Sequence, residues 1–376
     1  MRGRGVVLLT VLFLLFSCPL GVAAAEEREE GGAQVGKDAF LEELRTLLPE
    51  GFSPDVTDAD ALGEAVGVRA LFSFLLGEVR GAGDEVLSFF FLLMGASLFF
   101  SLAGALRAGA GGTLGEICET ALAAVLSLAL FERMHALLEE TAEGLSGAGR
   151  FFGGILPLLT GITAAGGGGT TAASQAMTME MTLSVLTALT DGVLLPLAMT
   201  LFALGLLEAI GGEGGGALVG MTGSVRRLFL WLVGVVTAVL AAALAMQSVI
   251  SSAADSAAMR AARFAAADLL PLVGGAVSGA LSAAASGLLY VKSIVGVSSV
   301  AALLFLSLPV LVRLLLYRAA FGVAIGFLSC TGAKAGERTL SAFRAALDTL
   351  IALSALSLLL YIFGIVCFMK CGVAVA

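Results

Sequence analysis

Residues 86–106 read VLSFFFLLMGASLFFSLAGAL, and this stretch decides the class of the protein. It contains 21 residues without a charge and is flanked by Asp84, Glu85 and Arg107. A helix of this length is about 32 Å long, enough to cross the ~30 Å hydrocarbon core of a bilayer. Five further apolar segments predict additional membrane-spanning helices, at 117–131, 182–207, 228–250, 294–312 and 350–369.

The composition of the whole chain points the same way. Of its 376 residues, 59% are hydrophobic and 13% are charged, whereas soluble domains average about 45–50% apolar and about 25% charged residues. The net charge is −8, and a nucleic-acid-binding surface needs a basic stripe instead. These figures exclude an ordinary soluble enzyme, a disordered protein and a nucleic-acid binder. They predict an all-α polytopic membrane protein with a Gly/Ala-rich bundle of about six to eight transmembrane helices.

The first 25 residues have the pattern of a secretory signal peptide. Arg2 and Arg4 precede an apolar run at 6–16, and an A-x-A site at 23–25 follows it. A charged start, a short apolar run and small residues at the cleavage site are typical of export signals. We expect cleavage after Ala25, the alternative being an uncleaved anchor. Either interpretation places the following residues outside the cytoplasm.

Residues 26–85 form an acidic segment, with 15 acidic and 5 basic side chains, before a transmembrane domain at 86–376. Its apolar residues recur at helical spacing, which predicts amphipathic helices. Such helices suit the membrane surface, a partner protein or the membrane domain of the same chain. The residues on the first apolar face are Phe40, Leu41, Leu44, Leu47 and Leu48.

Three segments leave the number of spans open between six and eight. Residues 151–165, 269–291 and 319–328 are apolar but short or rich in glycine, proline and serine, so each suits a re-entrant hairpin as well as a span. Cytoplasmic loops favour basic residues, and six spans collect most of them on that side. The predicted cytoplasmic loops then contain Arg107, Arg226, Arg227, Arg313, Arg318, Lys334, Arg338 and Arg344.

One polar stripe falls inside a predicted span. Its four residues fall on one helical face, and an intramembrane carboxylate is a functional hypothesis by default. We expect this stripe to face the interior of the bundle or a watery cavity, where it either forms hydrogen bonds between helices, the favoured interpretation, or lines a pathway. The stripe comprises Glu180, Ser184, Thr187 and Asp191. A second polar cluster, suited to an interfacial helix or a docking patch, contains Asp255, Arg260, Arg263 and Asp268.

Motifs for chemistry are missing from the sequence. His135 is the only histidine, so no H-E-x-x-H metal site is present. The glycines at 166–169 lack the Lys-Ser/Thr pair of a phosphate-binding loop. We therefore expect a protein that is not an enzyme and uses no metal and no small-molecule cofactor.

An ordered series of motifs from residue 151 to the C-terminus resembles the stage III sporulation protein AE family of endospore-forming bacteria. It begins with Ile155-Leu156-Pro157-Leu158-Leu159-Thr160, the glycines Gly166 and Gly167, and Leu195-Pro196-Leu197. The series continues with Trp231, Gln247, Asp255, Arg260, Arg263, Pro271, Gly274, Lys292, Gly296, Pro309, Arg313 and Tyr317. Arg260, Arg263 and Arg313 stand where lysine is common in the family, which preserves charge but changes hydrogen-bonding geometry.

The resemblance implies a non-enzymatic subunit of a mother-cell membrane complex. Proteins of this family work with the other stage III operon proteins and a forespore membrane partner in a channel or secretion-like assembly. Late forespore gene expression depends on that assembly. The resemblance also implies that the motif residues from Pro157 to Arg313 serve partner docking or structure.

The alternative is an independent secondary transporter. Interrupted helices at Pro157 and Pro196 and an intramembrane carboxylate suit a transporter. The sequence shows no convincing inverted repeat, which is the usual sign of such folds.

Overall fold

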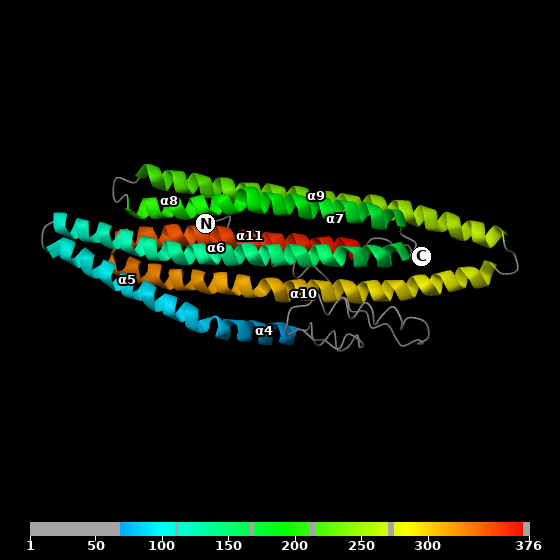
Figure 1. Cartoon of the computed structure of the whole chain (residues 1–376), viewed down its shortest axis with the longest axis horizontal. Coiled ribbons are helices and arrows are strands. Elements are labelled where there is room, and N and C mark those ends of the chain that lie inside the picture. The colour runs from blue at the N-terminus through cyan, green and yellow to red at the C-terminus, as the bar shows by residue number, and fades with distance from the viewer. Residues whose placement is uncertain (1–67, 110–111, 166–168, 211–215, 270–273, 371–376) are drawn as a thin grey trace. The chain divides into compact units, whose positions relative to one another are not determined.

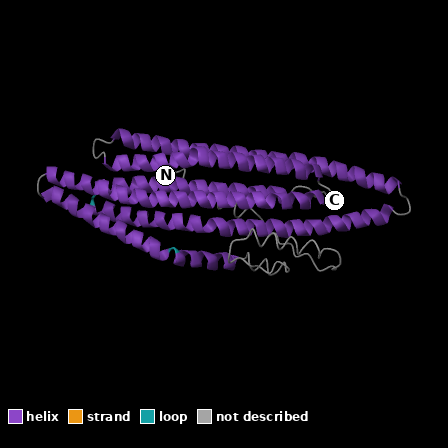
Figure 2. Cartoon of the chain, viewed as in Figure 1, coloured by secondary structure: helices purple, strands orange, loops and turns teal. Residues whose placement is uncertain are grey.

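The computed structural model describes residues 68–109, 112–165, 169–210, 216–269 and 274–370. The chain divides into two compact units, Met1–Thr46 and Leu47–Ala376, and all described residues belong to the second. The predicted signal peptide and most of the acidic segment lie outside the described residues. Within them the chain is helical almost throughout, and no strand occurs (Figure 2).

The elements run in the order α4 (Val68–Gly81), α5 (Gly83–Gly109), α6 (Gly112–Ala165), α7 (Gly169–Leu189), the π-helix η1 (Thr190–Leu194), α8 (Leu195–Ile210), α9 (Gly216–Leu269), α10 (Gly274–Thr331) and α11 (Lys334–Lys370). From α5 onward, successive helices are antiparallel, with α7, η1 and α8 forming one continuous rod (Figure 1). α5, α8 and α10 end on the left of the view, and α6, α9 and α11 begin there.

Six stretches of the described helices are long and apolar enough to cross a membrane. This agrees with the arrangement of six spans that the arginine positions favour, and it confirms the predicted all-α class. The six stretches are Gly83–Ala105, Ile117–Ala165, Ala172–Leu207, Gly220–Met246, Val291–Thr331 and Lys334–Met369.

α11 lies at the centre of the packing, in contact with α6, α8, α9 and α10. Large apolar side chains fill the core, among them the fully buried Phe89, Phe202, Phe321 and Phe343. An apolar core between helices gains little from the hydrophobic effect in lipid, so close packing has to hold it together.

Two of the three ambiguous segments are not re-entrant hairpins, so that interpretation was wrong for them. Residues 151–165 complete α6 and residues 319–328 lie within α10. Pro157 and Pro309 stand inside these helices without ending them. Near Pro157 the Thr160 hydroxyl donates a hydrogen bond of 2.7 Å to the carbonyl of Pro157. The third segment, 269–291, includes 270–273, which lie outside the described residues.

The predicted cytoplasmic loops were also drawn wrongly. Arg226, Arg227, Arg313 and Arg318 lie inside α9 and α10, and Arg344 lies inside α11. The acidic stretch after residue 131, predicted to connect two spans, is the middle of α6. A span predicted from hydropathy ends at a charged residue. The helix itself continues past that residue wherever the charged side chain has a partner or reaches water, because the backbone hydrogen bonds are unaffected.

Candidate functional site

Charged side chains from five helices meet at one level of the bundle. On α10 the Tyr317 hydroxyl donates to Glu85 Oε1 on α5 at 3.1 Å. The next residue, Arg318, donates through Nε to Asp348 Oδ1 on α11 at 2.6 Å. Because Tyr317 and Arg318 are neighbours in the chain, the carboxylates of Glu85 and Asp348 lie at the same height.

Three more contacts extend this level to α6 and α9. Arg133 Nη1 on α6 donates to Glu85 Oε1 at 2.9 Å. Arg226 Nη2 on α9 donates to Asp348 Oδ2 at 3.4 Å. Arg313 Nη1 on α10 donates to Glu140 Oε1 on α6 at 2.5 Å. We call the whole set the charged belt: Glu85, Arg133, Glu140, Arg226, Arg313, Tyr317, Arg318 and Asp348.

Asp348 is the most buried carboxylate among the ion pairs of the belt. Its side chain is 14% exposed and accepts from two arginines, one from α9 and one from α10. A charge removed from water has to be paired and hydrogen-bonded to be tolerated. The belt therefore joins helices that are distant in sequence and sets their relative height.

A charge-free helical section extends from the belt in each direction. After Glu85, α5 has no charge through residue 106, about 32 Å at the helical rise. After Asp348, α11 has no charge through residue 369, again about 32 Å. The two sections point in opposite directions from the belt. Residues 86–106 of α5 run toward the end of the bundle where α11 begins, and residues 349–369 of α11 run toward the opposite end. Together the sections are about twice as long as the ~30 Å core of a bilayer, so an upright bundle extends beyond one membrane core.

The predicted polar stripe lies on the outside of the bundle. Glu180, Ser184, Thr187 and Asp191 are all exposed, so the expectation that they face the interior of this chain's own bundle was wrong. The opposite face of the rod is the packed one, with Ala172, Gln175, Met179, Thr182 and Leu186 buried. The neighbouring helices decide which face of this rod is buried, and the sequence pattern alone did not identify those neighbours.

α6 carries a second exposed polar stripe, which the sequence analysis missed because these residues follow the predicted span at 117–131 and were not treated as part of a helix. Its members recur at helical spacing and share one face, which was the available signal. They are Glu132, Glu139, Glu143, Ser146 and Arg150.

The two stripes adjoin. A Cβ on Gly149 or Gly153 of α6 would lie 3.5 or 3.3 Å from the Leu183 side chain of α7, so these residues mark the contact between the helices. The residue after each contact residue, Arg150 and Ser184, belongs to a stripe. In an antiparallel pair this equal rotation brings both stripes to the same side of the contact. We call the two stripes together the outer polar face.

Asp191 occupies a special position in this face. It lies in the π-helix η1, where α7 passes into α8. π-helical turns inside α-helices occur frequently at functional sites.

The remaining family-motif residues are spread over the chain. Pro157 is exposed on α6, Pro309 is half-buried on α10, and Arg313 belongs to the belt. Lys292 is buried at 3% exposure, and Gly296 packs against Met369. The backbone of Gln247, Asp255, Arg260, Arg263 and Gly274 is helical, whereas Gly166, Gly167 and Pro271 lie outside the described residues.

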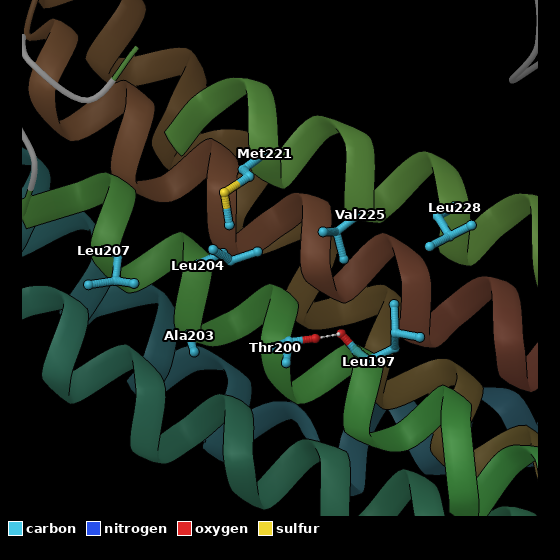
Figure 3. A pocket seen from close by; sticks show the side chains of 8 residues that line it. All are labelled: Leu197, Thr200, Ala203, Leu204, Leu207, Met221, Val225 and Leu228. Atoms are coloured by element: carbon cyan, nitrogen blue, oxygen red, sulfur yellow. Dashed lines mark hydrogen bonds between the residues drawn. The ribbon is translucent and has the colours of Figure 1, made fainter. Parts of the chain in front are cut away.

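A groove of about 490 Å³ opens between α8 and α9 (Figure 3). Its one hydroxyl, that of Thr200, donates to the Leu197 carbonyl at 2.7 Å and so is already satisfied. This groove suits an apolar chain and offers nothing to orient a polar cofactor. The other lining residues are Ala203, Leu204, Leu207, Met221, Val225 and Leu228. Within the described helices, no three His, Cys, Asp or Glu side chains gather as a metal ion would require.

Comparison with known proteins identifies the family. Residues 62–372 match the family model described as stage III sporulation protein AE. No curated protein matches the chain, and no solved structure matches it. The match runs from before α4 to beyond α11 and therefore covers every described helix. The chain belongs to the stage III sporulation protein AE family.

Proposed function

We propose that this chain is a non-enzymatic membrane subunit of the channel or secretion-like complex between mother cell and forespore. Late forespore development during endosporulation would depend on it. The observation that carries this proposal is the family match over residues 62–372. The six apolar stretches support a multi-pass location, which we place in the mother-cell membrane around the forespore, with the N-terminal segment extracytoplasmic.

The outer polar face supports a role in a larger assembly. Charged side chains exposed within apolar helices are poorly accommodated by lipid. Because Glu180, Ser184, Thr187 and Asp191 point away from this chain's own core, any passage they line needs walls from further protein. We propose that this stripe faces water in the assembled complex, with the other stage III operon proteins and the forespore membrane partner as its surroundings.

Genetics tests the proposal directly. The gene would be deleted in frame in the native host and restored in the mother cell only. We expect arrest after engulfment and loss of a late forespore reporter, both rescued by the mother-cell copy. Normal sporulation and normal reporter activity in the deletion strain would refute the proposed function.

Cysteine accessibility tests the stripe. Single cysteines at Glu180 and Asp191 would be compared, in a chain otherwise free of cysteine, with matched cysteines at the exposed apolar Met181 and Val185. We expect a charged, membrane-impermeant thiol reagent to modify the first pair much faster than the second during sporulation. Equal rates at all four positions would contradict a water-facing stripe.

An independent secondary transporter is the second candidate. The π-helix at Thr190–Leu194, next to the carboxylate of Asp191, favours it, because transporters place substrate sites at interrupted helices. The purified chain in vesicles distinguishes the two functions. Solute movement by the chain alone supports the transporter, and a requirement for partner proteins supports the complex subunit.

A further inference from the structure

Several charges next to the charged belt have no ion-pair partner among the described residues, and three of them lie on α6 and α9. Glu132 and Glu143 are exposed on α6, and Arg227 is exposed on α9. Their positions along the helices are fixed by neighbours that belong to the belt. Glu132 precedes Arg133, Glu143 lies one turn beyond Glu140, and Arg227 follows Arg226.

The acidic and basic members of this set lie on two helices that are separated by other helices of the bundle. α11 packs against both α6 and α9, whereas α6 and α9 hardly contact each other. Each of the three side chains is exposed, so each points away from the core of the bundle. One copy of the chain therefore presents negative charge on one helix and positive charge on another, and the two carboxylates lie about 16 Å apart along α6, on either side of Glu140 and Arg133.

We propose that copies of this chain pack side by side, with the acidic surface of α6 that carries Glu132 and Glu143 in one copy against Arg227 of the next. The partner is a second copy because copies inserted in the same orientation have their belts at the same height. Arg227 then faces the stretch of α6 between Glu132 and Glu143 without any vertical shift. The ion pairs inside each bundle are thus extended by further ion pairs between neighbouring copies.

The contact joins two different surfaces and is therefore head-to-tail. Contacts of this kind close into a ring when the rotation between neighbours permits it. Each interface covers acidic side chains of α6, and the adjoining α7 stripe then lies beside it. The inference goes beyond the proposed function, since a family member working as a single copy in the complex would satisfy that function equally well.

Charge reversal on the full-length protein tests the contact. One variant carries Arg227→Glu, and a second carries Glu132→Arg with Glu143→Arg. The matched control is Arg80→Glu, which reverses an exposed arginine on α4. Self-association would be measured for each purified protein by energy transfer between labelled copies in phosphatidylcholine vesicles, at several protein-to-lipid ratios.

We expect each reversal alone to weaken self-association at least tenfold, which corresponds to about 1.4 kcal/mol, and the control to leave it unchanged. A mixture of the two variants restores association, because every contact between unlike chains again joins opposite charges. A protein that had merely misfolded would not recover on mixing. The proposal is overturned if the unaltered chain is monomeric, if the single reversals associate normally, or if the mixture stays dissociated. A monomeric chain whose deletion still arrests sporulation would refute this contact and leave the proposed function standing.

Discussion

Gly144 of α6 lies close to Val310 of α10, and this contact helps to fix the position of α6 along α10. A Cβ built there would lie 2.7 Å from Cγ2 of Val310 on α10. The nearby Arg313–Glu140 ion pair joins the same two helices about one turn away. Gly144→Ala therefore tests a packing contact that no sequence pattern indicates.

Two opposing effects set the size of the change. Replacing glycine by alanine inside a helix stabilises it by about 0.8–1 kcal/mol. Forcing an extra methyl group into a packed site costs about 1–3 kcal/mol, and the branched Val310 side chain has little freedom to move away. Gly147→Ala is the matched control, because a Cβ at Gly147 meets nothing within 4 Å. We expect Gly144→Ala to be about 2 kcal/mol less stable than Gly147→Ala.

The assay is the free energy of unfolding in mild detergent, measured by pulse proteolysis over a titration with sodium dodecyl sulfate. Val310→Ala completes a double-mutant cycle, because it removes the methyl group that the new Cβ would overlap. We expect a favourable coupling energy of about 1–2 kcal/mol between the two substitutions. Equal stability of the Gly144 and Gly147 variants, or a coupling energy near zero, would refute the packing of α6 on α10.

Three further outcomes are expected, with stability measured in the same assay and sporulation measured in the native host. Asp348→Asn leaves two arginines without a carboxylate and lowers the free energy of unfolding by about 2 kcal/mol. The control Glu337→Gln on the same helix changes it by less than about 0.5 kcal/mol. Equal effects of the two substitutions would contradict the belt. Gly336→Ala places a Cβ 2.8 Å from Cγ of the buried Phe100, so it destabilises by about 1–3 kcal/mol, and a stabilised variant would show that α5 packs elsewhere. Asp191→Asn leaves stability within about 0.5 kcal/mol but lowers the frequency of sporulation; normal sporulation would remove this carboxylate from the proposed pathway.

The sequence predicted the helical class and the approximate positions of the spans, because apolar length is a local property. The uncharged run at 86–106 lies within α5, and 350–369 lies within α11. The ends of the helices were predicted poorly. Window-based reasoning stopped at Glu132 and at Arg227, where the helices continue because backbone hydrogen bonding does not depend on side-chain polarity.

The prediction for the site was only partly correct. The spacing of Glu180, Ser184, Thr187 and Asp191 identified a single helical face, and the exposure of all four agrees with that. The direction of the face was wrong, because it depends on which neighbours cover the other side. The stripe on α6 had the same kind of spacing and was overlooked because its residues lie outside the predicted spans.

The sequence by itself determined that the chain is an α-helical membrane protein, and its ordered motifs indicated the family. Composition and helical periodicity act over a few turns, so they can be read along the chain. Only the tertiary structure determined the charged belt, because its members are far apart in sequence, such as Glu85 and Tyr317, which are separated by 232 positions. The three-dimensional packing of the helices alone decides which charges are paired inside the bundle and which remain on its surface.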